Sequence, residues 1–182
     1  MMEPGTILKD QREDGDLLSH YREGDLEAAA ALYDRHCRGL YLYARSLTGD
    51  AARAEDAAQE AFVRLLERDA RRPPDSVQAF LYAVVRNLVR DDLRKAAVRR
   101  KADPAMFERR PGPWPGPCSE EEVGSAVLAL PEDQRETVVL KVYAGLTFAE
   151  IAELGGVSLA TAASRYRYAL EKLAESLKRG TS

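Results

Sequence analysis

Apolar residues recur at helical spacing along most of this chain, and no part of its first half alternates as a β-strand would. In the first hundred residues this pattern predicts four helices, over residues 14–23, 25–48, 50–69 and 76–100. The expected N-caps of the last three are Asp25, Asp50 and either Asp75 or Ser76. Gly24 and Gly49 end the first two helices, and connections this short are typical of a compact bundle.

The last third of the chain predicts a helix-turn-helix. Thr147 and Glu150 have the spacing of a capping box, in which each side chain satisfies the backbone N–H of the other residue. The helix that they begin should end at Gly155-Gly156, and Ser158 should cap a longer helix that runs to about Leu177. Two supporting helices are expected before it, one beginning at Ser119 and one over residues 132–143.

Each predicted helix has an apolar side that should face the core of its domain. In the second helix this side is Leu26, Ala30, Tyr33, Cys37, Leu40, Ala44 and Leu47. In the third it is Ala54, Ala58, Ala61, Phe62 and Leu65, and in the fourth Val77, Leu81, Val84 and Leu88. In the last helix it is Ala162, Tyr166, Ala169, Leu170, Leu173 and Leu177.

The opposite side of the last helix carries short polar, aromatic and basic residues: Thr161, Ser164, Arg167, Tyr168 and Lys172, with Arg165 on the flank. Docking in the major groove of DNA requires such a face on the second helix of the motif. The alternative is a plain helical hairpin with a solvated charged face. It explains the apolar spacing, but not the length of the turn or the small Ala152 where the helices approach each other. The pattern therefore favours DNA binding.

The formal net charge of −3 is unevenly distributed. Residues 71–110 hold 11 Lys and Arg against 5 Asp and Glu, whereas residues 1–70 hold 9 against 15. Residues 159–182 hold 5 against 2. Local basic zones, not the total, determine the affinity for phosphates. The acidic remainder predicts weak independent DNA binding and a partner that holds the protein on DNA.

We expect an all-α protein in which an N-terminal helical bundle and a C-terminal helix-turn-helix domain are joined by a Pro-rich linker. The expected ranges are 13–100, 119–182 and, for the linker, 101–118. No apolar run has membrane-spanning length and no signal sequence opens the chain, so a cytoplasmic location is expected. Cys37 is interpreted as a small core residue and Cys118 as exposed, and no disulfide, zinc site or other cofactor is expected.

Several segments resemble the sigma-70 family of bacterial RNA polymerase sigma factors. LTGD (47–50) and AEDAAQEAFVRLL (54–66) are similar to its second conserved region, and FLYAVVRNLVRDDLR (80–94) resembles the promoter-melting helix that follows. LPEDQRE (130–136), with the helix-turn-helix, resembles its fourth conserved region. A small protein with only these two regions is similar to the extracytoplasmic-function (ECF) group. The resemblance implies a protein that directs core polymerase to promoters and is not itself an enzyme.

The resemblance also implies three sets of functional residues. Binding of core polymerase falls to Asp56, Gln59, Glu60 and Arg64, which share one helix face. Recognition of the −10 element falls to Phe80, Tyr82, Arg86, Asn87, Arg90, Arg94 and Lys95, with rings for unstacked bases and cations for phosphates. Recognition of the −35 element falls to Ser158, Leu159, Ala160, Thr161, Ser164, Arg165, Arg167, Tyr168 and Lys172. The loop 69–77 corresponds to one that captures a flipped base in relatives, and its sequence indicates no pocket.

This sequence departs from the family pattern at some of these positions. Phe80 stands where most members have tryptophan, and a place in the bundle core is equally open for its ring. Residues 160–165 read ATAASR against the usual GTVKSR, so that Thr161, Ser164 and Arg165 match and a lysine is missing. For Arg165, a phosphate contact and a base contact are equally compatible with its place on the flank of the helix.

The partners implied are core RNA polymerase (its β′ clamp and β flap), promoter DNA and, as for many members, an anti-sigma factor. One alternative is a helix-turn-helix regulator that acts beside another sigma factor. Such a protein would need a receiver or ligand-binding domain, and the first half shows no strands or phosphoacceptor pocket for one. An enzyme is disfavoured because the sequence has no Gly-rich phosphate loop and no recognisable nucleophile–base arrangement.

Overall fold

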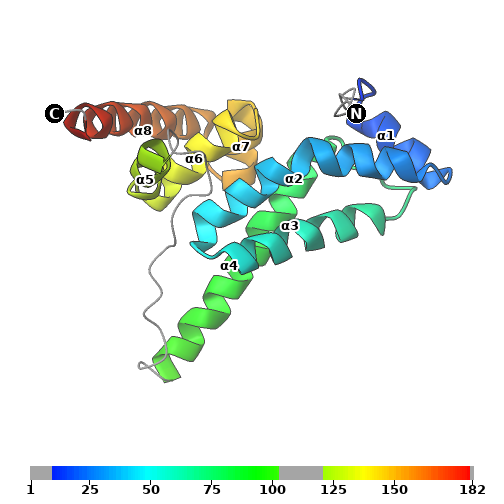
Figure 1. Cartoon of the computed structure of the whole chain (residues 1–182), viewed down its shortest axis with the longest axis horizontal. Helices are drawn as coiled ribbons and strands as arrows, with labels where there is room; N and C mark the ends of the chain where they lie inside the picture. The colour runs from blue at the N-terminus through cyan, green and yellow to red at the C-terminus, as the bar shows by residue number, and fades with distance from the viewer. Residues whose placement is uncertain (1–9, 103–120, 181–182) are drawn as a thin grey trace, which may run out of the picture.

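The computed structural model describes residues 10–102 and 121–180, and every regular element in those ranges is an α-helix (Figure 1). The N-terminal bundle consists of α1 (Asp14–Arg22), α2 (Leu26–Thr48), α3 (Ala51–Leu66) and α4 (Val77–Ala102). The helix-turn-helix domain consists of α5 (Glu121–Leu128), α6 (Glu132–Val142), α7 (Phe148–Gly155) and α8 (Leu159–Gly180). The predicted fold class is confirmed, and the predicted helix ends in the described residues agree to within three positions.

Local capping explains where the helices of the bundle begin and end. The carboxylate of Asp25 accepts hydrogen bonds from two backbone N–H groups in the first turn of α2, at 3.0 and 3.2 Å. Asp50 caps α3 in the same way, and Ser76, not Asp75, caps α4. Gly49 ends α2 with a φ of +65°, a left-handed conformation that glycine adopts without steric cost.

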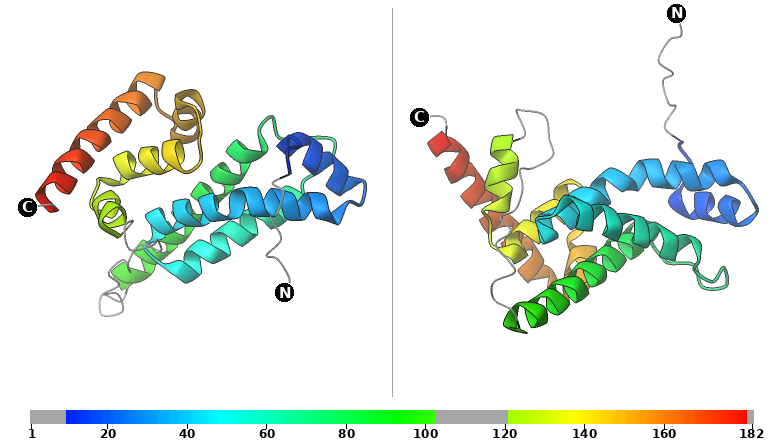
Figure 2. Two further views of the ribbon diagram at one scale, coloured as in Figure 1. Left: turned by 45° about the horizontal axis from the view of Figure 1, so that its top comes forward. Right: turned by 60° about the horizontal axis from the view of Figure 1, so that its bottom comes forward.

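The bundle is built around α2, against which α1, α3 and α4 all pack. Figures 1 and 2 show α2 and α3 running side by side, α4 crossing them, and the C-terminal part of α4 extending beyond the bundle. Polar contacts hold α1 in place, since the carboxylate of Asp14 accepts hydrogen bonds from Arg35 and His36. The fully buried side chains of the bundle include Leu17, Leu18, Leu32, Leu40, Tyr43, Leu65, Leu81, Tyr82 and Val85.

The predicted buried side of α2 is wrong in its first half. Leu26 is 75% exposed and Tyr33 is 44% exposed, whereas Ala28, Leu32 and His36 are buried in their place. Apolar residues occur on several sides of this helix, so their spacing left two candidate faces. The tertiary structure decides between them, because α1 supplies a carboxylate that lets a histidine occupy a core position.

Elsewhere the predicted faces are confirmed with local corrections. The apolar side of α3 is buried as predicted. In α4, Val85 and Val89 are more deeply buried than Val84 and Leu88, which the sequence pattern had placed inward. In α8, Leu170 is 43% exposed although it was expected in the core. The buried face of α4 is shifted because this helix packs against α2, α3 and α7 at once.

The helix-turn-helix domain packs directly on the bundle. α6 lies against α2, and α7 lies against α4 (Figure 2). The buried side chains of Val139, Leu140 and Ala144 belong to the same apolar cluster as Leu40 and Val85 of the bundle. The two parts of the chain therefore share one continuous core in this arrangement.

Several predictions concern residues that the structure does not describe. The Pro-rich linker from residue 103 onward, Cys118 and the expected cap at Ser119 all lie outside the described residues. Cys37 is partly buried against the core of the bundle. Among the helices of the described ranges, none combines the length and the apolar character that crossing a membrane requires.

Candidate nucleic-acid interface

Capping at both helices fixes the geometry of the helix-turn-helix. The Thr147 hydroxyl accepts a hydrogen bond from the N–H of Glu150 at 3.2 Å, and the Glu150 carboxylate accepts one from the N–H of Thr147 at 2.7 Å. α7 then ends at Gly156, whose φ of +65° permits the sharp turn. Ser158 caps α8 by accepting a hydrogen bond from the N–H of Thr161 at 3.1 Å. The predicted capping box and turn are confirmed.

The predicted −35 face of α8 is accessible in this structure. Leu159 is 58% exposed and Tyr168 is 48% exposed. The guanidinium of Arg167 lies over the ring of Tyr168, 5.0 Å from its centroid, which gives the helix a flat cationic surface. All the predicted −35 residues are exposed or half-buried: Ser158, Leu159, Ala160, Thr161, Ser164, Arg165, Arg167, Tyr168 and Lys172.

Arg165, on the flank of this face, is held by an acidic residue of α6. Its Nε atom lies 3.0 Å from Oδ2 of Asp133. The other oxygen of Asp133 accepts a hydrogen bond from the N–H of Gln134 at 2.9 Å, which fixes the carboxylate. A partly exposed ion pair of this kind contributes about 0–1 kcal/mol, so a DNA phosphate or base can replace Asp133.

The outer part of α4 presents the second predicted surface. Asn87, Arg90, Arg94 and Lys95 are all exposed. Arg90 and Arg94 are four positions apart and therefore lie on the same side of the helix. Arg94 is 3.0 Å from Asp91, an exposed pair that phosphate can displace. These side chains are accessible to a nucleic acid backbone, which can displace the exposed partner of Arg94.

Two other residues predicted for the −10 surface are covered. Tyr82 is 1% exposed, its ring packs on that of Tyr43 with centroids 5.4 Å apart, and its hydroxyl fills the space above Gly39. Burial raises the pKa of Tyr82. Arg86 is 8% exposed. The expectation of an accessible aromatic surface at Tyr82 is not met in this arrangement, because α2 covers the ring.

For Phe80 the sequence left two roles open, a ring in the bundle core and a ring that stacks on DNA bases, and its position in the structure is compatible with both. Its ring is half-buried and packs against the core of the bundle. The guanidinium of Arg68 lies over the same ring, 4.9 Å from the centroid. Phe80 therefore stands at the border between the core and the surface that faces nucleic acid in our prediction.

A buried ion pair joins the two domains behind this surface. Glu136 of α6 is 8% exposed, and its Oε1 atom accepts hydrogen bonds from the hydroxyl of Tyr43 and from Nε of Arg86, both at 2.7 Å. Its Oε2 atom lies 3.7 Å from Arg90. Burial, together with the Glu136 carboxylate, raises the pKa of Tyr43 well above its ordinary value, so this hydroxyl remains a donor. Removing one partner of such a pair typically costs about 3–5 kcal/mol.

A cavity of about 580 Å³ lies where α4 and α7 face each other. From the bundle it is lined by Phe80, Arg86 and Asn87, three of the predicted −10 residues. From α7 it is lined by Glu150 and Glu153. The helix-turn-helix domain thus places two carboxylates beside the predicted −10 surface.

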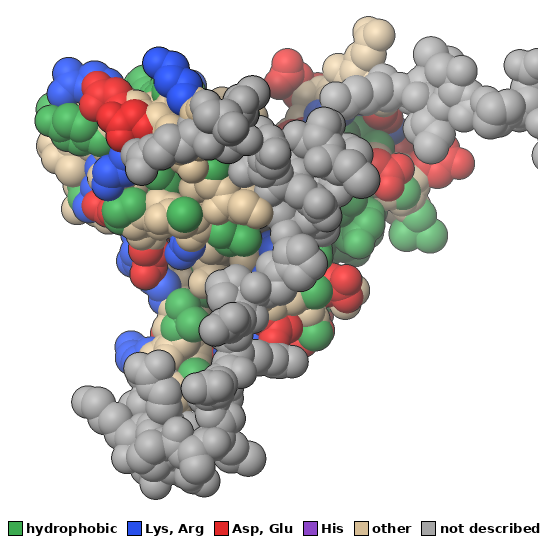
Figure 3. Space-filling model, turned by 60° about the vertical axis from the view of Figure 1, so that its left-hand side comes forward, with side chains coloured by type: hydrophobic (Ala, Val, Ile, Leu, Met, Phe, Trp, Pro, Cys, Tyr) green, Lys and Arg blue, Asp and Glu red, His purple; other side chains and the backbone are tan. Residues whose placement is uncertain are grey.

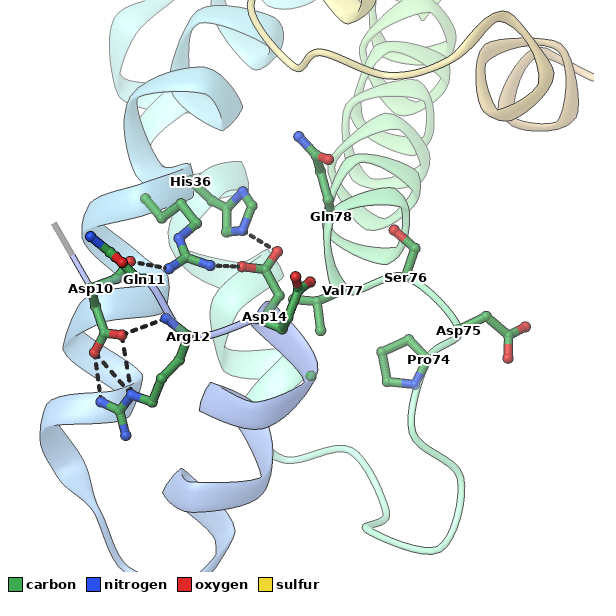
Figure 4. A pocket seen from close by; sticks show the side chains of 13 residues that line it. Asp10, Gln11, Arg12, Asp14, His36, Pro74, Asp75, Ser76, Val77 and Gln78 are labelled. Carbon is green, nitrogen blue, oxygen red and sulfur yellow. Dashed lines mark hydrogen bonds and ion pairs between the residues drawn. The ribbon is translucent and has the colours of Figure 1, made fainter.

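A second cavity, of about 660 Å³, adjoins the loop before α4 (Figure 4). One wall is the end of that loop with the start of α4, Pro74 to Gln78, and the other is residues 10–15 with α2. Figure 4 shows the carboxylate of Asp14 directed toward His36 of α2, and Gln78 extending from the start of α4. The sequence indicated no pocket at this loop, and the structure shows one because residues 10–15 close its far side.

The predicted polymerase-binding residues share an exposed face of α3. Asp56 and Gln59 are exposed, and Glu60 is joined to Arg64 by an ion pair of 2.8 Å. A shallow cavity of about 300 Å³ borders this face, lined in part by Asp56, Glu60 and Asp92. The structure therefore brings these four residues together as the helical spacing predicted.

Charges of both signs occur on the outer surface. Figure 3 shows Lys and Arg side chains interspersed with Asp and Glu on the side where the end of α8 comes forward, not one uniform basic field. On α8 itself, Arg167 lies within 4.0 Å of Glu171. Weak binding of duplex DNA by the chain alone stays a prediction, which rests on this mixture of charges.

Sequence reasoning missed the residues that join the two domains. Glu136 was recognised only as part of the LPEDQRE segment, and Tyr43 and Gln78 were not singled out. The Gln78 side-chain amide donates a hydrogen bond to the backbone carbonyl of Ala144, across the junction. Tyr43 and Glu136 are 93 positions apart, so no local pattern could have paired them.

Comparison with known proteins finds two family matches in this chain. A model of sigma-70 region 2 matches residues 32–99, and a model of sigma-70 region 4 matches residues 120–173. The ECF RNA polymerase sigma factor EcfG of Rhodopseudomonas palustris is 34% identical over 140 residues, which cover 74% of this chain and 76% of the relative. SigL of Mycobacterium tuberculosis, also an ECF sigma factor, is 32% identical over 157 residues, 79% of this chain and 85% of the relative.

The solved structures that share the fold include the following two. The sigma factor RpoE of Bartonella quintana, solved with the anti-sigma factor NepR, matches with a TM-score of 0.68 and 23% identity, over 88% of this chain and 98% of that one. CnrH, solved with the cytosolic domain of CnrY, matches with a TM-score of 0.60 and 26% identity, over 91% of this chain and 97% of that one.

Proposed function

The chain belongs to the ECF group of sigma-70-type RNA polymerase sigma factors, and we propose how its residues divide the work of promoter recognition. As a member of this group it directs core RNA polymerase to promoters and initiates transcription there. We assign residues 13–100 to polymerase binding and the −10 element, 101–118 to the linker, and 119–182 to the −35 element. The observation that supports this assignment is that each of the two domains presents exposed Arg and Lys side chains, on α4 and on α8.

The −10 element is bound along α4. Arg90, Arg94 and Lys95 are exposed and neutralise phosphates, and Asn87 offers a paired donor and acceptor to a base edge. Phe80 supplies a partly exposed ring beside them, and Arg86 joins this surface when its partner on α6 moves away. Tyr82 supports the surface from beneath, since its ring is buried. The cavity beside the loop before α4 is the place for a flipped base.

The −35 element is bound by the exposed face of α8. The start of α8 carries the hydroxyl groups of Ser158 and Thr161, with Arg165 about one turn beyond Thr161 and Arg167 further along the helix. Short polar groups near the start of this helix approach base edges, whereas the later basic residues reach phosphates. Arg165 is held in place by Asp133 until DNA binds.

The exposed face of α3 binds core polymerase. Asp56, Gln59, Glu60 and Arg64 lie together there and are not required for packing, because the opposite side of α3 forms the core. We assign this face to the β′ clamp, and the helix-turn-helix domain to the β flap.

This chain performs no catalysis of its own and works in the cytoplasm, where core polymerase is found. We assign an anti-sigma factor as a further partner, as for the RpoE structure that shares its fold.

Transcription with core polymerase tests the proposal. Transcripts made when the protein is overproduced identify its promoters, and one such promoter then serves as a run-off template. We expect core polymerase plus this chain to give a product of defined start site with no other sigma factor present. Product that appears only when a second sigma factor is added would make the chain an accessory regulator.

A matched pair of variants tests the −10 assignment. Arg94→Ala removes one proposed phosphate contact, whereas Arg38→Ala removes an exposed arginine of α2 that lies outside all three surfaces. We expect Arg94→Ala to lower open-complex formation several-fold and to reduce the slope of log affinity against log salt by about 1. Equal effects of the two variants would contradict a specific role for this end of α4.

A further inference from the structure

The carboxylate of Glu136 belongs to the helix-turn-helix domain, but each of its side-chain partners belongs to the bundle. It accepts hydrogen bonds from Tyr43 and Arg86 at 2.7 Å and lies 3.7 Å from Arg90. The network therefore exists only while the two domains are in contact. Two of its three partners, Arg86 and Arg90, are residues that we assign to the −10 element.

We propose that Glu136 is an intramolecular lock, whose carboxylate occupies the cationic site that a phosphate of promoter DNA would otherwise take. In the free chain the lock holds the helix-turn-helix domain over α4 and keeps Arg86 from solvent. This inference rests on the proposed −10 role of Arg86 and Arg90. A carboxylate and a phosphate present similar oxygen acceptors to a guanidinium, so each can replace the other.

Two further contacts hold the domains in the same arrangement. The Gln78 side-chain amide donates a hydrogen bond to the carbonyl of Ala144, and the apolar core runs unbroken from α2 into α6. Glu150 and Glu153 then line the cavity that also contains Phe80, Arg86 and Asn87. While the domain stays in place, these carboxylates repel any phosphate that approaches the α4 surface.

The chemistry of the network makes the lock reversible. A buried ion pair gains little net stability, because both charges lose their hydration when they are buried. Its main effect is to fix one orientation of the helix-turn-helix domain relative to the bundle. When the domains separate, water solvates Glu136, and Arg86 becomes available to DNA. The closed arrangement and nucleic acid thus compete for the same guanidinium, and each must weaken the other.

The closed arrangement is also incompatible with reading two promoter elements. One turn of B-DNA is roughly 34 Å long, and two elements more than a turn apart cannot both be reached by domains packed against each other. The face of α8 would remain free in the closed chain, whereas the −10 surface is partly covered. Opening of the lock is therefore required for melting, but not for a first contact through α8.

The test compares Glu136→Gln with Glu132→Gln in the free full-length chain. Glu132 is exposed on the first turn of the same helix, so its variant loses the same charge outside the lock. Small-angle scattering measures the size of each chain, and fluorescence anisotropy measures binding to a labelled 20-nucleotide dT strand. We expect Glu136→Gln to have a larger radius of gyration and to bind the strand about tenfold more tightly, because apparent affinity rises with the open fraction. Glu132→Gln should match the wild type in both measurements.

Tyr43→Phe provides a milder second variant, because it removes one hydrogen bond and keeps the ring. It should change both measurements in the same direction and by less, with the helical circular dichroism of wild type. If Glu136→Gln loses helical content, Tyr43→Phe decides the outcome alone. An unchanged radius of gyration would overturn the lock, and expansion without tighter binding of dT would overturn the competition with DNA. Neither measurement uses polymerase, so failure of run-off transcription would count against the proposed function and not against the lock.

Discussion

The Nε atom of Arg165 lies 3.0 Å from Oδ2 of Asp133, so one cation of the recognition helix is already paired within the protein. Asp133→Asn removes the carboxylate that competes with DNA for Arg165. We expect the binding of duplex promoter DNA to tighten about two- to fivefold, because a partly exposed ion pair contributes about 0–1 kcal/mol. The gain should shrink as salt is raised. Anisotropy titrations at several salt concentrations measure it, with Glu132→Gln as the control for charge. A gain of the same size in the control would mean that Asp133 acts only through net charge.

Position 39 accommodates only glycine without rearrangement, because the hydroxyl of Tyr82 fills the space that a Cβ atom of residue 39 would occupy. Gly39→Ala should therefore lower the free energy of unfolding by about 1–3 kcal/mol through overpacking. Gly15→Ala is the matched control, since a Cβ there meets nothing and alanine favours a helix by roughly 0.5–1 kcal/mol. Adding Tyr82→Phe to Gly39→Ala should restore part of the loss. Urea unfolding measures all three, and a fully stable Gly39→Ala would contradict the close contact.

Asp14 should make the attachment of α1 sensitive to acid. Burial raises the pKa of this carboxyl, but hydrogen bonds and charge from His36 and Arg35 outweigh it and leave the pKa below its ordinary value of 3.8. A lowered pKa means that Asp14 stabilises the folded chain above pH 3.8 and that this contribution is lost as the pH falls through the folded-state pKa.

The measurement for Asp14 is the stability difference between wild type and Asp14→Asn as a function of pH. We expect wild type to be the more stable at about pH 5, and the difference to shrink toward about pH 2. Asp16→Asn, an exposed carboxyl on the same helix, is the control and should show a smaller difference at every pH. A difference for Asp14→Asn that does not change with pH would rule out the ionised carboxylate as its source.

The exposed face of α3 gives a prediction about polymerase. Replacing Gln59 with Ala and Glu60 with Lys should weaken binding to core polymerase about tenfold, because the double change removes one polar contact and reverses one charge near the centre of the proposed interface, where a single residue can cost more than about 1 kcal/mol. Helical content should not change, because neither side chain packs in the core. Glu27→Lys, an exposed charge reversal on α2, is the control. Equal affinity of the double variant and wild type would remove this face from the binding site.

Local sequence determined where the helices of this protein begin and end. The caps at Asp25, Asp50 and Thr147 each involve residues two or three positions apart, and Gly49 and Gly156 terminate helices through their own backbone freedom. Such interactions are complete within one turn, so they follow from the sequence alone. The buried side of α3 was also predicted from the sequence, because Ala54, Ala58, Ala61, Phe62 and Leu65 recur at helical spacing on one side. The helix-turn-helix and the exposure of its recognition face were predicted from the same local features, the helix caps and the spacing of apolar residues.

The tertiary structure decided which surfaces are available. Spacing along α2 could not show that Leu26 is exposed and His36 buried, since the choice depends on Asp14 of another helix. Nor could it show that Arg86 is covered, because the covering carboxylate of Glu136 lies 50 positions further along the chain. The burial of a charged side chain depends on the counter-charge that meets it in space, and distant segments supply that partner. Sequence therefore determined which residues can contact DNA, and only the packing of the two domains determined which of them are free to do so.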